Sequence, residues 1–222
     1  MIAVFAAEEV EVRALLARLD EARAVPGPFP AHLGLLSGRP ALLVHSGVGK
    51  AAAAAAVAWA LARHRPKAAL FAGVAGALAP ELKTGELLVA LDAVQWDVDL
   101  TAFGRAPGEL ATGERFLAAD PRLVALLEEA GADRVGRVAS GDRFVADPEL
   151  ATWIRATFAA DAVEMEGAAA LWTARRFGVP AALLRAISDA AGKKARLDFE
   201  TFLIEGSERM AELLARAVAR IK

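Results

Sequence analysis

Two glutamates stand two residues apart in the stretch VEMEGAAA (163–170), which otherwise contains small and apolar residues. Glutamate is rarely buried without a partner, so this composition indicates a carboxylate with a specific task. Glu164 and Glu166 share one face if the backbone is extended, and they diverge if a helix begins at Met165. Two interpretations of Glu166 stay open: an acid tolerated in the first turn of a helix, or a carboxylate directed at sugar hydroxyls or at a developing positive charge.

A second charged stretch, RAISD (185–189), ends an apolar run. In an extended strand Arg185, Ile187 and Asp189 point to the same side. An arginine within an apolar strand needs an anionic partner, and Glu164 or Glu166 could supply it. The local pattern therefore leaves a structural ion pair and a functional role for Arg185 both open.

Three further segments lie where apolar runs end. GVAGAL (73–78) and SGDRF (140–144) each follow such a run, and the ligands of open α/β sheets bind outside the carboxyl ends of the strands. Glycines at these ends let a ligand approach the backbone. AAEEVEV (6–12) supplies Glu8, Glu9 and Glu11 just after the first apolar run. Most acids in such a position are solvated residues of a first helical turn, so the local pattern alone does not make any of them catalytic.

The stretch SGVGKA (46–51) suggests a phosphate-binding loop but departs from the known patterns. Val44 occupies the first glycine position of the Walker motif, and Ala51 follows Lys50 where Ser or Thr is required. The glycines meet the looser dinucleotide fingerprint, but the next expected strand ends without the acid that holds a ribose. We therefore expect a tight strand-to-helix turn that could still place its backbone against a ligand, and no nicotinamide cofactor.

These segments need a scaffold, and short apolar runs do alternate with helical patterns along the chain. The alternation predicts a three-layer α/β/α sandwich with a central mixed sheet, formed by a single domain over residues 1–222. We expect strands at 2–6, 31–37, 41–46, 67–72, 85–94, 134–140, 160–165 and 179–188. We expect helices at 8–19, 50–64, 121–130, 148–158, 167–177 and 198–221, with loops at 25–30 and 190–197.

Composition restricts the class of protein. The 222 residues carry 26 Lys and Arg against 28 Asp and Glu, and no basic stripe is visible, so nucleic-acid binding is not expected. The chain has no cysteine, and its three histidines lack the spacing of ligands, so we expect neither disulfides nor a metal site. The N-terminus lacks a basic leader, and the most apolar helical segment, residues 51–62, is too short to span a bilayer, so we expect a cytoplasmic protein without membrane contact.

Together the segments resemble a known family. AAEEVEV, SGVGKAAAA, GVAGALAP, DVDLTAFG, SGDRFV, VEMEGAA, RAISDAAG and LDFETFL follow one another as in the 5′-methylthioadenosine/S-adenosylhomocysteine nucleosidases of the nucleoside phosphorylase superfamily. VEMEGAA and RAISD at this spacing are the specific part of the resemblance. It implies a nucleoside phosphorylase-like fold and hydrolysis of the N-glycosidic bond between adenine and a ribose with a 5′ thioether, without a cofactor, in a homodimer.

The resemblance also assigns roles to residues. Asp189, steadied by Ser188, would protonate N7 of the departing adenine, and Glu11 would activate water, with Glu9 as the second candidate. Glu166 would bind the ribose hydroxyls near the charge of an oxocarbenium-like transition state, and Arg185 would orient the water and Glu11. The remaining residues would bind substrate: Met165 at the sugar, Phe144 and Val145 at adenine, Val74 near sugar and water, Val48 and Phe199 at the 5′ group, and Phe103 in the pocket of the partner subunit.

Several positions depart from the family pattern. Val74 stands where the family usually has serine, Glu8 where it has methionine, and Arg105 where it has tyrosine. Arg105 and the segment after it, which lacks an expected proline, lie in the partner-supplied lid over the 5′ substituent, so a hydrolase for futalosine or aminofutalosine remains an alternative. A purine nucleoside phosphorylase is a weaker alternative, because the turn GVAGA lacks the arginine that would hold phosphate. A binding protein without catalysis would lack one of the acids Glu11, Glu166 and Asp189, and all three are present.

Overall fold

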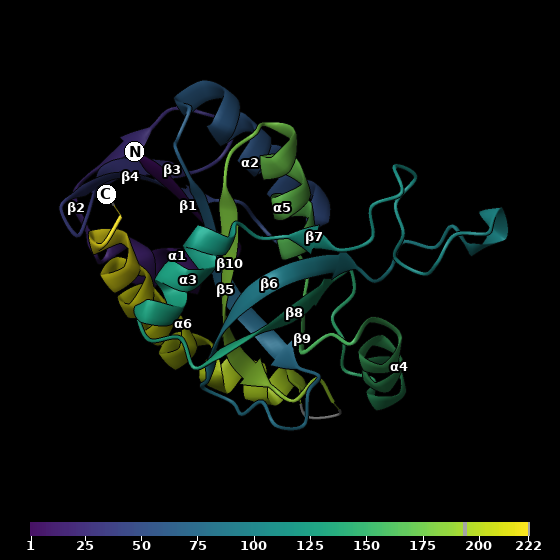
Figure 1. Cartoon of the computed structure of the whole chain (residues 1–222). Coiled ribbons are helices and arrows are strands. Elements are labelled where there is room, and N and C mark those ends of the chain that lie inside the picture. The colour runs from purple at the N-terminus through teal and green to yellow at the C-terminus, as the bar shows by residue number, and fades with distance from the viewer. Residues whose placement is uncertain (193–194, 222) are drawn as a thin grey trace.

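A mixed sheet forms the centre of the computed structural model, which describes residues 1–192 and 195–221 and arranges ten strands of these residues in one sheet (Figure 1). The strands are β1 (Ile2–Ala6), β2 (Leu19–Val25), β3 (Ala31–Leu36), β4 (Arg39–His45), β5 (Ala69–Ala77), β6 (Leu87–Gln95), β7 (Leu117–Ala118), β8 (Arg134–Ser140), β9 (Ala162–Glu164) and β10 (Ala181–Asp189). The helices are α1 (Glu9–Leu16), α2 (Lys50–His64), α3 (Pro121–Glu129), α4 (Pro148–Phe158), α5 (Gly167–Arg176) and α6 (Ala195–Ala219), with a 3₁₀ turn η1 (Thr101–Phe103).

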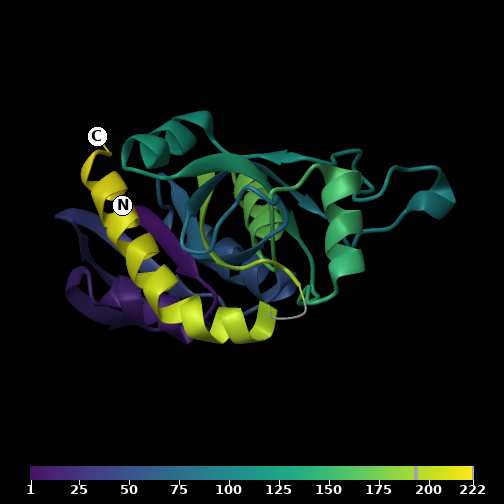
Figure 2. The same ribbon diagram turned by 90° about the horizontal axis from the view of Figure 1, so that it is seen from below.

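Helices cover both faces of the sheet. α2 and α5 pack together on one face, and α1, α3 and α6 pack together on the other (Figures 1 and 2). Three alanines of α2, Ala53, Ala56 and Ala60, are fully buried, and such small side chains let neighbouring helix axes approach closely. The predicted three-layer α/β/α sandwich is confirmed, and the alanine run is part of its packing.

One half of the sheet closes into a ring. β5 pairs in parallel with β1 and β10, and its last residues pair antiparallel with β9. From β10 the ring continues through β6 and β8 back to β9. Parallel β1, β5 and β10 end at one edge, and the register of β9 sets Val163 opposite Gly76 at the end of β5. The closure therefore brings VEMEGAA to the same edge as RAISD.

Two helices begin with the same sequence signal. Asp120 precedes Pro121, and its carboxylate accepts the N–H groups of Arg122 and Leu123 at 3.0 and 3.3 Å. Asp147 precedes Pro148 in α4 in the same way. An aspartate cap satisfies free N–H groups of the first turn, and proline at the first position lacks the N–H that would go unpaired. These signals explain why the predicted starts of both helices are confirmed.

The structure corrects several predicted elements. The first helix ends at Leu16 instead of Leu19, and residues 19–25 form β2, which has only one fully buried residue and pairs with β3. GVAGA continues β5 instead of following it, because β10 and β9 both pair with this segment. The last helix begins at Ala195, within the predicted loop 190–197, of which residues 193–194 lie outside the described part of the chain. β7 and η1 were not predicted.

Candidate active site

One pocket lies at the edge of the sheet where β1, β5, β9 and β10 meet. Its lining includes every predicted site residue except Arg185 and Phe103. The residues concerned are Glu11, Val48, Val74, Phe144, Val145, Met165, Glu166, Ser188, Asp189 and Phe199. Segments separated by more than a hundred residues thus contribute to one cavity, as the convergence of strand ends predicted.

Glu11 is the acid of the first segment that enters the pocket, and it is 2% exposed. Its Oε2 accepts the N–H groups of Ala7 at 3.0 Å and Glu8 at 2.9 Å, and its Oε1 accepts that of Val74 at 2.9 Å. Burial raises the pKa of Glu11, and these N–H groups and the charge of Arg185 partly offset the rise. Glu9, the second candidate, instead pairs with Arg13 at the surface.

Glu166 lies between β9 and α5 and points into the pocket. It is the residue that precedes α5, yet its side chain makes no hydrogen bond to the helix end. Its Oε1 instead accepts the N–H of Gly49 at 2.8 Å, in the turn that leads to α2. Burial, with a further contribution from the charge of Glu164, raises the pKa of Glu166 to about 8. Glu166 therefore precedes the first turn of α5 instead of standing in it, and its carboxyl group faces the pocket.

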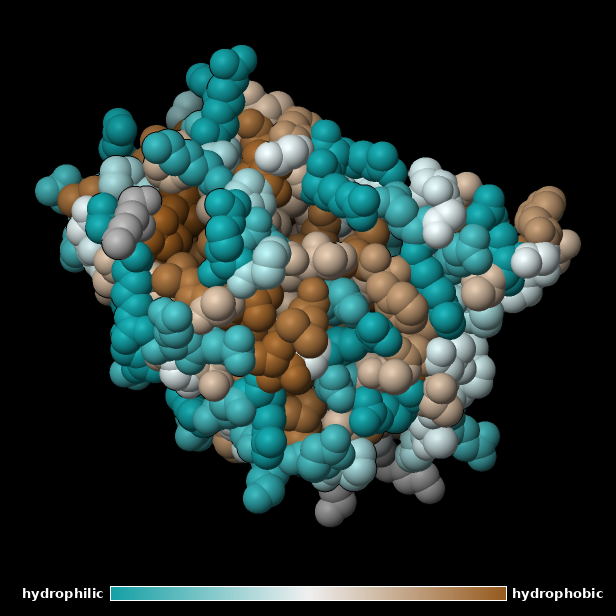
Figure 3. All heavy atoms as spheres, in the orientation of Figure 1, coloured by the Kyte–Doolittle hydropathy of each residue, from teal (hydrophilic) through white to brown (hydrophobic). Residues whose placement is uncertain are grey.

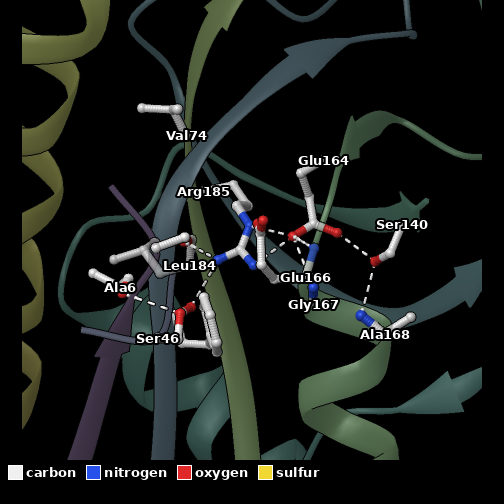
Figure 4. Close-up of polar contacts among 12 residues, drawn as sticks. Ala6, Ser46, Val74, Ser140, Glu164, Glu166, Gly167, Ala168, Leu184 and Arg185 are labelled. Atoms are coloured by element: carbon white, nitrogen blue, oxygen red, sulfur yellow. Dashed lines mark hydrogen bonds and ion pairs between the residues drawn. The ribbon is translucent and has the colours of Figure 1, made fainter. Parts of the chain in front are cut away.

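The carboxylate of Glu164, instead of that of Glu166, lies against the N-terminal end of α5. Figure 4 shows its carboxylate between Arg185, Ser140 and the start of α5. Its Oε2 accepts Arg185 Nη2 at 2.7 Å and Gly167 N–H at 2.8 Å. Arg185 does not line the pocket, because its guanidinium also donates through Nη1 to the carbonyl oxygens of Phe71 and Leu184. Of the two partners that the sequence left open for Arg185, the structure selects Glu164.

Asp189 closes β10 and is 3% exposed. Its Oδ2 accepts the hydroxyl of Ser188 at 2.8 Å, and its Oδ1 accepts the N–H of Ala191 at 2.8 Å. Burial raises the pKa of Asp189 and the charge of Asp198 adds to the rise, while the two hydrogen bonds lower it. The neighbouring strand allows this close fit, because a Cβ at Gly76 would lie 2.9 Å from Asp189 Oδ1.

Aromatic and apolar residues form the rest of the lining. The rings of Phe144 and Phe199 meet edge to face at a centroid distance of 5.9 Å. Phe199 comes from α6 and Phe144 from the loop after β8, so two distant segments close the pocket together. Such flat apolar surfaces suit a purine ring or an alkyl group. Three charged residues that were not assigned to the site, Glu8, Arg143 and Glu164, also line the pocket.

Residues 96–116 connect β6 to β7 and project from the body of the molecule as an arm (Figures 1 and 2). Phe103 lies in the arm and is 82% exposed, and apolar atoms mark the arm's end in the space-filling view (Figure 3). Arg105 pairs with Glu109 at 2.6 Å inside the arm. The structure thus places Phe103 away from the pocket of its own chain.

Two features, a metal-binding cluster and a membrane-spanning helix, are absent from residues 1–192 and 195–221, the part of the chain that the structure describes. No cluster of three or more histidines and acids has the geometry to hold a metal ion there. In the same residues, no helix has the length and apolar character needed to cross a membrane.

The sequence model described as the phosphorylase superfamily matches residues 1–219. The chain belongs to the phosphorylase superfamily. The 5′-methylthioadenosine/S-adenosylhomocysteine nucleosidase of Geobacillus thermodenitrificans is 36% identical, and the alignment covers 96% of this chain and 93% of that one. The aminodeoxyfutalosine nucleosidase of Campylobacter jejuni is 34% identical over 81% of each chain. The structure of the Neisseria meningitidis 5′-methylthioadenosine/S-adenosylhomocysteine nucleosidase with methylthio-immucillin-A is 34% identical, with a TM-score of 0.95 and 99% of both chains covered.

Membership of the phosphorylase superfamily confirms the predicted nucleoside phosphorylase-like fold. Two polar contributions to the site were not predicted. Ser140 ends β8, and its hydroxyl donates to Glu164 and accepts the N–H of Ala168 at 2.8 Å. The N–H of Gly49 reaches Glu166 from the SGVGKA turn. The position of Ser140 in SGDRF, at a strand end, was the sequence signal that could have identified it.

Proposed function

We propose that this phosphorylase-superfamily chain is a nucleosidase that hydrolyses the N-glycosidic bond of 5′-methylthioadenosine and S-adenosylhomocysteine and releases adenine. The observation that carries the proposal is the convergence of Glu11, Glu166 and Asp189 in one pocket, each nearly excluded from solvent. Relatives and solved structures with this activity in their names, similar along nearly the whole chain, support it.

The environments of the three acids suit three tasks. Burial raises the pKa of Asp189, which favours the protonated carboxyl group that would donate to the ring nitrogen of a departing purine. Glu11 is fixed by three backbone N–H groups and keeps acceptor positions for a water molecule. Glu166 can accept hydrogen bonds from ribose hydroxyls and stabilise positive charge on the sugar ring as the base departs.

Charge favours water over phosphate as the attacking group. Glu8, Glu11, Glu166 and Asp189 line the pocket, so a phosphate dianion near Glu11 would meet acidic side chains instead of a cluster of cations. Arg143 is the single cationic residue in that lining among the described residues. Arg185 is buried and paired with Glu164. These observations support a hydrolase rather than a phosphorylase.

The 5′ substituent is the less constrained part of the proposal. Arg143 and Glu8 could meet the carboxylate and ammonium groups of a homocysteine tail, and Arg143 could also meet the carboxylate of aminofutalosine. The relationship to an aminodeoxyfutalosine nucleosidase makes that compound a second candidate substrate. We place the chain in methionine salvage in the cytoplasm, where the first two substrates would arise.

We further propose that the chain acts as a homodimer. The exposed side chain of Phe103 at the arm would then complete the 5′ region of the partner's pocket. An isolated chain leaves this large apolar ring in water, and its burial against a second copy would be favourable. Sedimentation of the protein, with Phe103→Ala beside it, measures this association.

A substrate panel tests the proposed function. The protein is incubated with 5′-methylthioadenosine, S-adenosylhomocysteine, aminofutalosine, futalosine and inosine, with and without phosphate, and the free base is separated by chromatography. Release of adenine from the first two compounds, unchanged by phosphate, is expected. Release that requires phosphate, or that occurs only with inosine, would contradict the proposal.

A further inference from the structure

Glu164 and Ser140 together close the N-terminal end of α5. Glu164 Oε2 accepts the N–H groups of Glu166 at 3.1 Å and Gly167 at 2.8 Å. Ser140 Oγ accepts the next N–H, that of Ala168, at 2.8 Å and donates to Glu164 Oε1. The free N–H groups of a first helical turn attract carboxylates. Because Glu164 and Ser140 already accept these N–H groups, the groups no longer attract the carboxyl group of Glu166.

Glu164 also forms an ion pair with Arg185. The guanidinium reaches Glu164 Oε2 through Nη2 at 2.7 Å and Nε at 3.2 Å, and the two side chains are 1% and 3% exposed. Its Nη1 is satisfied by the carbonyls of Phe71 and Leu184 at 2.8 and 3.0 Å. No donor of Arg185 is bonded to Glu166 in the part of the chain that the structure describes.

Within the described residues, the carboxyl group of Glu166 is therefore left with one hydrogen bond, from the N–H of Gly49. Its side chain lies in the pocket, where the ribose hydroxyls are proposed to bind. The charged groups that act on it are Glu164 from β9, Arg185 from β10 and Glu11 from α1. Glu8, Arg143 and Asp189 line the same pocket.

We propose that Glu164, held by Ser140, is a positioning residue that engages both Arg185 and the end of α5 and so leaves the carboxyl group of Glu166 free for the ribose hydroxyls. The proposal rests on the nucleosidase function above. Without the Glu164 carboxylate, Arg185 and the α5 N–H groups would both attract Glu166 away from the sugar.

Proton release is the consequence that can be measured. The pKa of Glu166 is raised to about 8 by burial and by the charge of Glu164, so the acid is largely protonated in the free site at neutral pH. Two ribose hydroxyls that donate to Glu166 favour its ionised form, and the proton passes to the buffer. Ligand binding at pH 8 should then release about half of a proton from this group.

Two substitutions should change the release in opposite directions. Glu164→Gln removes the neighbouring negative charge and leaves the charge of Arg185 to act on Glu166, so Glu166 is largely ionised before the ligand binds and the release falls toward zero. Arg185→Met leaves the negative charge of Glu164 uncompensated beside Glu166, so the release rises toward one proton. Glu212→Gln is the matched control, because Glu212 lies 62% exposed on α6 in an ion pair with Arg216.

The experiment is calorimetry of ligand binding in buffers of different ionisation enthalpy at pH 8. The ligand is the 7-deaza analogue of 5′-methylthioadenosine, which lacks the ring nitrogen that Asp189 would protonate. The same ligand without its 2′ and 3′ hydroxyls should release no proton from Glu166. Thermal melting identifies folded variants, and either Glu164→Gln or Arg185→Met decides the question if the other does not fold.

Unchanged or increased release in folded Glu164→Gln, or unchanged or decreased release in folded Arg185→Met, would overturn the positioning role. Affinity provides a second measure, and we expect it to fall about tenfold in Glu164→Gln, because Arg185 then competes with the ribose for Glu166. Failure of the wild-type protein to bind the ligand at all would instead refute the proposed function. The two failures are therefore distinguishable.

Discussion

Replacement of Asp189 by asparagine separates proton donation from every other task of the site. The backbone N–H of Ala191 can still donate to an amide oxygen, and the hydroxyl of Ser188 can turn to accept from the amide nitrogen. The side chain keeps its size, so the packing against Gly76 is retained. Reorientation of the Ser188 hydroxyl should cost no more than about 1 kcal/mol, so the melting temperature should fall by no more than about 2–4 °C.

The chemical step should suffer far more than the fold. A positioned general acid contributes about 10²–10⁴-fold to the rate, which corresponds to about 2.7–5.4 kcal/mol of transition-state stabilisation. We therefore expect kcat for adenine release by Asp189→Asn to fall by that factor. KM should change little, because the other contacts to the nucleoside remain.

The assay compares two leaving groups on the same 5′-methylthioribosyl unit. Adenine needs a proton to depart, whereas p-nitrophenolate leaves as a stable anion. Asp189→Asn should lose adenine release and retain most of its activity on the nitrophenyl compound. An equal loss on both compounds, in a folded protein, would refute the assignment of Asp189 as the acid.

Other substitutions test the rest of the site. Glu11→Gln should lower kcat about 10²–10⁴-fold and destabilise the fold by about 1–3 kcal/mol, since an amide NH₂ cannot accept the N–H groups that Glu11 accepts; retained kcat would return Glu9 to consideration. Gly76→Ala should lower kcat at least about tenfold, because its Cβ would lie 2.9 Å from Asp189 Oδ1; wild-type kinetics would show that Asp189 tolerates displacement. Phe103→Ala should raise KM for 5′-methylthioadenosine, because the ring would no longer complete the 5′ region of the partner's pocket, and an unchanged KM would exclude the arm from the site.

The sequence was sufficient to predict the elements that form the candidate site. RAISD and VEMEGAA end or follow short apolar runs, and strand ends of an α/β sheet meet at one edge, so Asp189 and Glu166 could be placed together before the structure. Helices with an Asp-Pro start were predicted at their observed first residues. Local signals of this kind depend little on the rest of the fold.

Tertiary contacts decided what the sequence left open. In the sequence, Glu164 and Glu166 are equivalent candidates to pair with Arg185. The ring closure at β9 directs Glu164 to the arginine and Glu166 to the pocket. β2 was missed because it lies at the sheet edge with almost every residue exposed, so it lacks the apolar alternation of a strand. The glycines of β5 suggested a turn, but pairing on both sides keeps the segment extended.

The identity of the attacking group, water or phosphate, tests most directly the proposal that this member of the phosphorylase superfamily activates water. The reaction with 5′-methylthioadenosine is run in phosphate buffer made with water enriched in the heavy oxygen isotope, and the sugar product is analysed by mass spectrometry. We predict free 5-methylthioribose with one heavy oxygen at C1, incorporated during cleavage. As a control, unlabelled 5-methylthioribose is exposed to the same water for a short time, and it should take up no heavy oxygen. Formation of 5-methylthioribose 1-phosphate would contradict the hydrolytic role of Glu11.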